Sequence, residues 1–123
     1  DEIIYVNAND LELEQLYSQA HVFVYPSIYE GFGIPILEAY SFSCPIALSN
    51  TSCFPEIAGY AGEFFDPYSV PDIIRAINNV INNPERRSQL IDFGHQRVKR
   101  YTWNETARQT ELSYFRALGI SSF

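Results

Sequence analysis

The sequence has few cations, no methionine, only two cysteines and no long hydrophobic run. Its 123 residues contain 8 Lys and Arg against 15 Asp and Glu, a net charge of −7 at pH 7. Proteins that bind nucleic acid neutralise backbone phosphates with clustered cations, whereas here the cations are scattered along the chain. We therefore expect no nucleic-acid partner.

Two further signals are missing, a membrane-spanning run and a metal-binding cysteine pattern. No stretch reaches the roughly 18 apolar residues that a membrane helix requires, and none has the layout of a signal peptide. Cys44 and Cys53 have neither the spacing of a zinc site nor that of a redox pair. They are interpreted as small structural thiols in a reducing cytoplasm, and no metal is expected.

The absence of methionine indicates that the chain does not begin where translation began, so we expect a longer protein. Hydrophobic residues make up 46% and aromatic residues 15% of the sequence, which is enough for a packed core. A chain of 123 residues is expected to form one domain over 1–123 and to bury roughly two thirds of its unfolded surface.

Strand-like and helix-like segments alternate in the first half of the chain, which predicts an α/β fold with a parallel sheet. The predicted strands are 3–6, 21–25, 45–49 and 62–65. The predicted helices between them are 11–19, 35–42 and a single turn at 55–58. The section 70–123 is predicted to be helical, with helices over 70–81, 84–100 and 102–119.

Particular residues carry expectations about helix ends and packing. Asp10 is predicted to cap the first helix, and Thr102 with Glu105 to form a capping box. Trp103 is predicted to anchor the last helix in the core. The cations of the helix 84–100 are interpreted as a solvated face, comprising Arg86, Arg87, Arg97, Lys99 and Arg100.

The most informative stretch is 25–39, where a strand passes through a glycine loop into a helix. Pro35 suits the first turn of that helix. Gly31 and Gly33 have no side chain, so a ligand can approach the backbone closely. Such a loop directs free backbone N–H groups at an anion, and the helix dipole adds partial positive charge.

Two carboxylates, Glu30 and Glu38, flank this loop with seven residues between them. Because carboxylates accept hydrogen bonds from hydroxyl groups, the combination suits a ligand that carries both phosphates and hydroxyls. The loops after 21–25 and 45–49, and the turn at 7–9, leave the carboxyl ends of predicted parallel strands. They are expected to share the rim of the sheet where ligands bind.

The string EGFGIPILEA, from Glu30 to Ala39, resembles the glutamate–seven–glutamate motif of the retaining group 1 glycosyltransferases of the GT-B fold. Other segments are similar in the same order, namely 14–17, Ala20, 22–27, 45–50, 54–59, 66–67, Gly94 and the region of Trp103. The resemblance implies a Rossmann-like parallel sheet with flanking helices. It identifies the chain as part of a C-terminal domain that binds a nucleotide-sugar donor.

The resemblance also implies roles for individual residues. The backbone amides expected to bind the sugar and phosphates are those of Gly31, Phe32, Gly33 and Ile34. Glu30, the catalytic candidate, is expected to hold sugar hydroxyls, and Glu38 to bind the ribose hydroxyls. Ser49 and Asn50, and the Thr51 and Ser52 that follow, are candidates for further donor contacts. The donor is a substrate, and no cofactor is expected.

For the whole protein, the resemblance implies sugar transfer in polysaccharide or glycan synthesis, in the cytoplasm or peripheral to the inner face of the membrane. In this family an N-terminal acceptor domain and the basic residues that neutralise the diphosphate precede the matching segment. The isolated chain is therefore expected to bind donor weakly and to transfer no sugar. The strand 3–6 would be a bare sheet edge, which predicts self-association.

Other functions are weaker interpretations of the same residues. A glycosidase would need one glutamate to be protonated, and no apolar pocket or like-charge partner is evident near either. A phospho-receiver domain would need paired acids after its first strand and a lysine after its fifth, but the only lysine, Lys99, lies in a predicted helix. A non-catalytic nucleotide-sugar module and a sugar-nucleotide epimerase of the same fold remain open.

Overall fold

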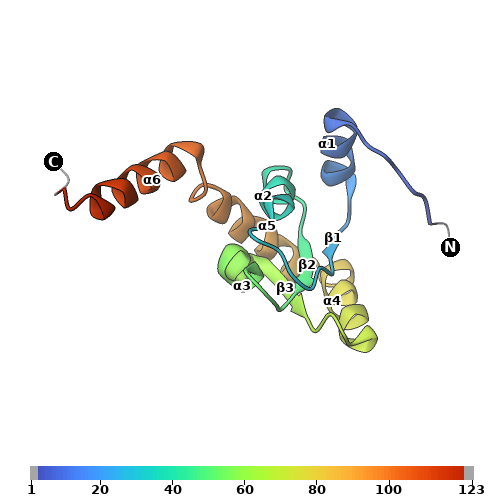
Figure 1. The fold of residues 1–123 in the computed structure, drawn as a ribbon. Coiled ribbons are helices and arrows are strands. Elements are labelled where there is room, and N and C mark those ends of the chain that lie inside the picture. Colours follow the sequence, from blue (N-terminus) through green and yellow to red (C-terminus); the bar gives the residue numbers. More distant parts are fainter. Residues whose placement is uncertain (1–2, 121–123) are drawn as a thin grey trace.

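The computed structural model describes residues 3–120, and its centre is a three-stranded parallel sheet (Figure 1). The strands lie in the order β1 (Phe23–Tyr25), β2 (Ile46–Ser49) and β3 (Gly62–Phe65). The helices are α1 (Asp10–Gln19), α2 (Ile34–Ser41), α3 (Phe54–Ala58), α4 (Val70–Asn82), α5 (Pro84–Val98) and α6 (Trp103–Ala117), with a short 3-10 helix η1 (Gly59–Ala61). The α/β class and the parallel sheet are confirmed.

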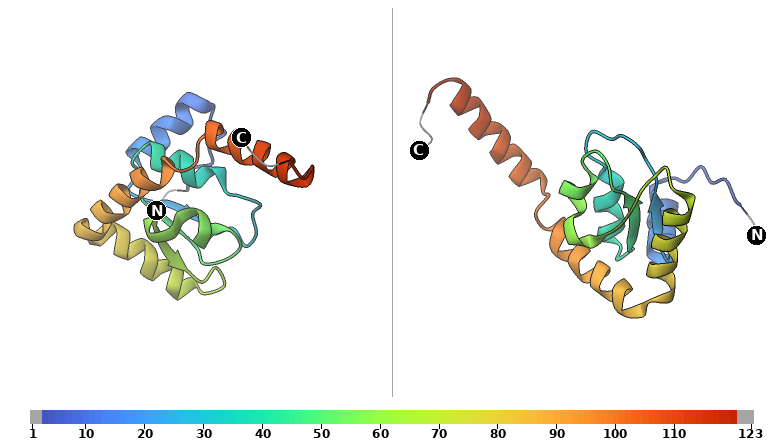
Figure 2. Two further views of the ribbon diagram at one scale, coloured as in Figure 1. Left: turned by 90° about the vertical axis from the view of Figure 1, so that its left-hand side faces the viewer. Right: turned by 90° about the horizontal axis from the view of Figure 1, so that it is seen from below.

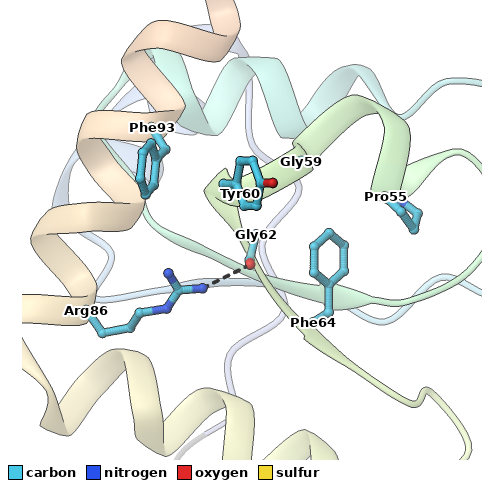
Figure 3. A pocket seen from close by; sticks show the side chains of 7 residues that line it. All are labelled: Pro55, Gly59, Tyr60, Gly62, Phe64, Arg86 and Phe93. Atoms are coloured by element: carbon cyan, nitrogen blue, oxygen red, sulfur yellow. Dashed lines mark hydrogen bonds between the residues drawn. The ribbon is translucent and has the colours of Figure 1, made fainter.

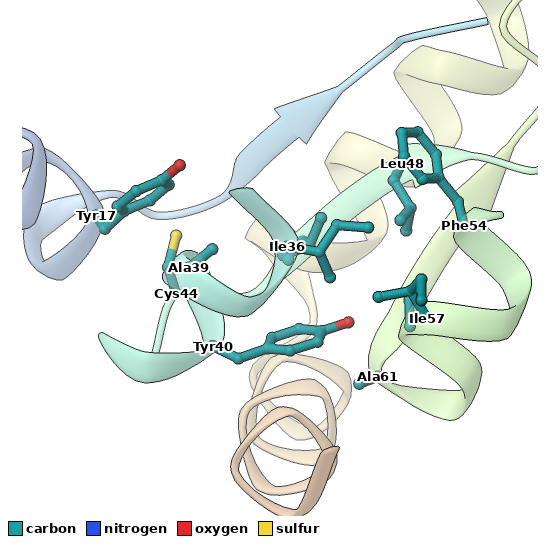
Figure 4. Packing of buried hydrophobic residues seen from close by; sticks show 11 residues of the cluster. Tyr17, Ile36, Ala39, Tyr40, Cys44, Leu48, Phe54, Ile57 and Ala61 are labelled. Carbon is teal, nitrogen blue, oxygen red and sulfur yellow. The ribbon is translucent and has the colours of Figure 1, made fainter. Parts of the chain in front are cut away.

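The two faces of β2 are covered by different helices. Alternate side chains of a strand point to opposite faces. Ile46 and Leu48 belong to one buried cluster with residues of α2 and α3 (Figure 4), whereas Ala47 packs in a second cluster with Ala76 of α4. All four residues of β2 are buried, which explains why this strand is a continuous apolar run rather than an alternating one.

Helices α2 and α5 approach each other closely where Gly94 faces Tyr40. Replacing Gly94 with alanine should lower the free energy of unfolding by about 1–2 kcal/mol, because the new Cβ would lie 2.7 Å from Cδ1 of the buried Tyr40 ring. The higher helix propensity of alanine stabilises the variant by only about 1 kcal/mol, which is less than the destabilisation from overpacking. Urea denaturation checks the prediction, with the exposed Gln89→Ala on the same helix as control. A stability equal to or above that of the wild type would contradict it.

The free edge of β3 is covered by two arginines that come from different helices. Arg75 of α4 and Arg86 of α5 both pair with the buried carboxylate of Glu63, at 3.0 and 2.8 Å. Their other guanidinium nitrogens donate to the β3 carbonyls, Arg75 to Phe64 at 2.7 Å and Arg86 to Gly62 at 3.2 Å. These bonds occupy edge carbonyls that would otherwise pair with another strand.

The prediction of one solvated cationic face on 84–100 is therefore wrong for two of its residues. Arg86 lies against Glu63, as described. Arg97 donates from Nε to the Ile57 carbonyl at 2.7 Å and from Nη2 to the Glu56 carbonyl, so it caps the end of α3. The sequence of the helix does not show which residues of other elements Arg86 and Arg97 contact.

The predicted strand 3–6 does not form, because residues 3–9 have no regular secondary structure. Ile3 is 100% and Tyr5 92% exposed, and within residues 3–120 no strand lies beside them to supply backbone hydrogen bonds. The expected turn at 7–9 therefore follows no strand, and β1 lies at this edge of the sheet. The prediction of self-association through a 3–6 edge loses its basis.

Two expectations at helix ends also need correction. The cap of α1 is Asn9 rather than Asp10, and Asn9 forms a reciprocal box with Glu12. Thr102 accepts from the Glu105 N–H as predicted, but the Glu105 carboxylate pairs with Arg108 instead of returning to the cap.

Trp103 is 85% exposed and does not anchor α6. No residue of α6 is buried, and the helix extends away from the rest of the fold in the right-hand view of Figure 2. The apolar residues at helical spacing in 103–118 correctly predicted the helix but not its packing, because periodicity does not require a partner within the same chain.

Candidate functional site

Two loops meet at the carboxyl edge of the sheet. β1 and β2 are parallel, so the loop 26–33 that follows β1 and the loop 50–53 that follows β2 leave the same edge. They touch through side chains of the second loop, with Thr51 donating to the Ser27 carbonyl at 3.4 Å. The first loop carries Glu30, Gly31, Phe32 and Gly33, which are among the residues predicted to bind the nucleotide sugar.

Glu30 is half-buried in the first loop and is held by its neighbours. The Ser27 hydroxyl donates to Glu30 Oε1 at 2.9 Å. Tyr25, the last residue of β1, lies close by. Burial raises the pKa of Tyr25 to about 12, with the adjacent Glu30 carboxylate as the next cause and Glu38 as a lesser one.

Glu38 lies on α2, and the Tyr17 hydroxyl of α1 donates to its Oε2 at 3.3 Å. Burial, followed by the charge of Glu38, raises the pKa of Tyr17 above its ordinary value. The Tyr17 ring is also packed edge-on against Phe23 at 5.3 Å between centroids. The Tyr17–Glu38 hydrogen bond connects α1 to α2 and leaves Glu38 Oε1 without a hydrogen bond from any residue in 3–120.

Between the two glutamates lies a row of four backbone N–H groups that have no protein acceptor within residues 3–120, namely those of Gly31, Phe32, Gly33 and Ile34. Gly33 precedes α2 with φ +89°, a left-handed conformation that suits glycine. A Cβ on Gly31 would meet no atom within 4 Å, so the space beside that residue is open.

The remaining predicted donor contacts lie in contrasting positions. Ser49, the last residue of β2, is fully buried, and its hydroxyl donates to the Tyr25 carbonyl at 3.4 Å. Asn50 is exposed and its N–H donates to the Phe65 carbonyl at 2.8 Å. Contact between either residue and a donor stays a prediction, although the placement of the Ser49 hydroxyl gives it a role in joining β1 to β2.

The sequence interpretation missed how Ser52 and Cys53 are used. Ser52 accepts from the Glu30 N–H at 3.2 Å and donates to the Glu30 carbonyl at 2.8 Å. The Cys53 thiol lies 3.1 Å from the Phe32 carbonyl oxygen. No local pattern marks these contacts, because the two loops are joined only when β1 and β2 pair.

The hollow drawn in Figure 3 lies between β3, α5 and the segment formed by α3 and η1. It is lined by Pro55, Gly59, Tyr60, Gly62, Phe64, Arg86 and Phe93. None of the predicted donor residues contributes to it.

Two other kinds of site are absent from residues 3–120. No group of three or more His, Cys, Asp or Glu side chains is arranged to hold a metal ion there. No helix in this part of the chain combines the length and apolar content of a membrane span.

Known proteins resemble this chain in both sequence and fold. It is 39% identical over 105 residues to O-antigen chain mannosyltransferase B of Escherichia coli, which covers 85% of this chain and 28% of that protein. It is 32% identical over 114 residues to MMP alpha-(1->4)-mannosyltransferase of Mycolicibacterium hassiacum, again with 28% of the relative covered. The chain thus spans under a third of the length of these relatives.

A solved structure, sucrose-phosphate synthase from Thermosynechococcus elongatus, superimposes with a TM-score of 0.79 at 25% identity, over 96% of this chain and 31% of that one. Residues 1–97 match the family described as glycosyl transferases group 1. A family match over this much of the chain, agreeing with the fold and with the loop between Glu30 and Glu38, shows that the chain belongs to the group 1 glycosyltransferases.

Proposed function

We propose that this chain supplies the donor site of an enzyme that transfers mannose from a nucleotide-diphosphate sugar with retention of configuration. The observation that carries the proposal is the row of N–H groups at Gly31–Ile34, which have no protein acceptor within residues 3–120 and lie between Glu30 and Glu38 along the chain. Mannose is proposed because the named relatives include an O-antigen chain mannosyltransferase and a second mannosyltransferase. The proposed acceptor is a growing glycan.

Each group has a chemical task in this proposal. The leaving diphosphate gains negative charge in the transition state, and preorganised N–H groups at the start of α2 stabilise it. Glu30, held by Ser27, accepts hydrogen bonds from sugar hydroxyls. Glu38, held through Oε2 by Tyr17, accepts from the ribose hydroxyls with its other oxygen. This division gives the amides and the two carboxylates complementary tasks toward one ligand.

The rest of the enzyme is proposed to come from outside this chain. The chain spans 28% of the mannosyltransferase B relative, and the cations of the chain that contact Glu63 or cap α3 are engaged away from the row of N–H groups. We therefore place the cations that neutralise the diphosphate, and the acceptor domain, in other segments of the protein. The isolated chain should accordingly bind donor weakly and turn none over.

Substitution of Glu30 tests the function in the complete polypeptide that carries this sequence. Turnover of GDP-mannose and UDP-glucose is followed by release of the nucleotide diphosphate, and the configuration of the product by NMR. Glu30→Ala should reduce kcat by about 100-fold or more, since it removes a group that contacts the reacting sugar. The matched control is Glu111→Gln, an exposed carboxylate on α6.

If the wild type and the variant both bind the sugar nucleotide without turnover, the protein is a nucleotide-sugar binding module and not a transferase. Epimerised donor in place of transferred sugar would assign a sugar-nucleotide epimerase. Turnover that survives Glu30→Ala unchanged would contradict the role proposed for this residue.

A further inference from the structure

The loop 50–53 contacts the backbone of the loop 26–33 through consecutive side chains. Thr51 donates to the Ser27 carbonyl, Ser52 bonds both backbone groups of Glu30, and the Cys53 thiol lies against the Phe32 carbonyl. The bonds thus reach the first loop at its start, at its glutamate and within the row of N–H groups. We propose that Ser52, supported by Cys53, is a positioning residue that orients this row of N–H groups for the donor, an inference that rests on the proposed function.

The planar peptide unit connects each fixed carbonyl to the N–H group of the next residue. In a trans peptide the carbonyl of one residue and the N–H of the next point in opposite directions. No cis peptide is present in residues 3–120. Fixing the Glu30 carbonyl on Ser52 therefore turns the Gly31 N–H away from Ser52, and fixing the Phe32 carbonyl on Cys53 turns the Gly33 N–H away from Cys53.

The two glycines of the loop 26–33 make hydrogen bonds from the loop 50–53 necessary to fix its backbone. Gly31 and Gly33 flank Phe32 and have the widest conformational freedom of any residue. A Cβ on Gly31 would contact nothing within 4 Å, so packing does not fix that residue. Hydrogen bonds from the neighbouring loop to Glu30 and Phe32 restrict the peptide units that the glycines leave free.

The backbone of Ser52 itself supports this role. Ser52 has φ +56°, in the left-handed region that a non-glycine residue rarely occupies. Such a conformation persists only where other contacts maintain it, and it is found preferentially at functional sites. Ser52 is exposed, so burial does not hold it in place, and the contacts that restrain its side chain are its two hydrogen bonds to Glu30.

The test compares Ser52→Ala with Ser52→Gly in the complete polypeptide. Both variants remove the hydroxyl, and the glycine variant also relieves the left-handed backbone, which guards against a folding defect. The assay uses GDP-mannose, or UDP-glucose if only that sugar nucleotide is turned over. Both variants should lower kcat/KM by about 10- to 100-fold, because the backbone N–H groups would be misplaced. The KM for the donor should rise, because the N–H groups contact it. The control is Ser113→Ala, which removes an exposed hydroxyl bonded to a backbone carbonyl on α6.

Hydrogen–deuterium exchange of the peptide covering 26–34 separates this inference from the proposed function. In the wild type, GDP should slow exchange in that peptide. Without GDP, both Ser52 variants should speed it, because the Glu30 N–H loses its acceptor. Unchanged exchange and unchanged donor KM in both variants would overturn the positioning role while leaving the donor site in place. A wild-type peptide that GDP does not protect, in an enzyme without turnover, would overturn the proposed function and the positioning role with it.

Discussion

Replacing Glu63 with alanine should lower the free energy of unfolding by about 2–3 kcal/mol, among the largest effects expected for any single substitution in this protein. The Glu63 carboxylate is only 9% exposed and pairs with Arg75 and Arg86, so its removal leaves Arg86, itself 26% exposed, without its partner. Both arginines would also lose the contact that holds them over the carbonyls of Gly62 and Phe64. Urea denaturation at pH 7 measures the loss.

Two variants make this result interpretable. Asp92→Ala removes an exposed carboxylate from α5 and should change stability by less than about 0.5 kcal/mol. Glu63→Gln keeps the shape and part of the hydrogen bonding, so it should fall between the wild type and the alanine variant. An alanine variant as stable as Asp92→Ala would show that the pairing contributes no net stability.

The same carboxylate should make stability depend on pH. Burial opposes ionisation of Glu63, but hydrogen bonds from Arg86, Asn79 and Arg75 outweigh it and hold the pKa below its ordinary value of 4.5. A lowered pKa contributes stability that is present above the ordinary value and is lost as the pH falls through the folded-state pKa. The difference in unfolding free energy between wild type and Glu63→Gln should therefore shrink between pH 5 and pH 3. A difference that grows on acidification would contradict this sign.

Gly33→Ala should cost about 2–4 kcal/mol, whereas Gly31→Ala, two residues away, should leave stability almost unchanged. Gly33 has φ +89°, and a Cβ there would lie 3.0 Å from Phe54 Cε1 and 3.1 Å from Ile36 Cδ1, so backbone strain and overpacking add. Gly31 has no positive φ, and its Cβ would meet no atom within 4 Å. Thermal and urea denaturation of both variants measure the contrast.

The pair also separates folding from binding. If the open side of Gly31 is where the donor lies, its new methyl group should raise the donor KM about tenfold or more while the protein unfolds like the wild type. Gly33→Ala should instead lower activity only in proportion to the folded fraction plus any shift of the loop. A Gly31→Ala enzyme with unchanged KM would place the donor elsewhere.

Residues close together in the sequence were sufficient to predict the strand, loop and helix that form the site. The strand ending at Tyr25, the glycine loop and the helix begun by Pro35 were predicted because their signals lie within a few residues of one another. Alternation of strands and helices gave the parallel sheet, and parallel strands place successive loops at one edge. The resemblance to a family added the expected roles of Glu30 and Glu38, which remain proposals.

The sequence-based predictions were wrong where a segment depends on contact with another element, because periodicity does not show which element that is. Residues 3–6 have the apolar character of a strand, but a strand forms only beside another, and none lies there within 3–120. Trp103 has the size and apolar character of a core residue, yet α6 buries no residue. Arg86 lies on a charged helix face, and only the position of β3 shows that Glu63 faces it.

The sequence by itself determined which segments form strands and helices and that a glycine loop between two glutamates follows β1, since these depend on local geometry and spacing. Only the tertiary structure decided that Ser52 forms hydrogen bonds with Glu30, 22 residues away, and that Arg75 and Arg86 both form ion pairs with Glu63. The physical reason is that hydrogen bonds and ion pairs act over a few ångströms, so their partners are fixed by how the strands and helices assemble. Position along the chain does not encode that assembly directly.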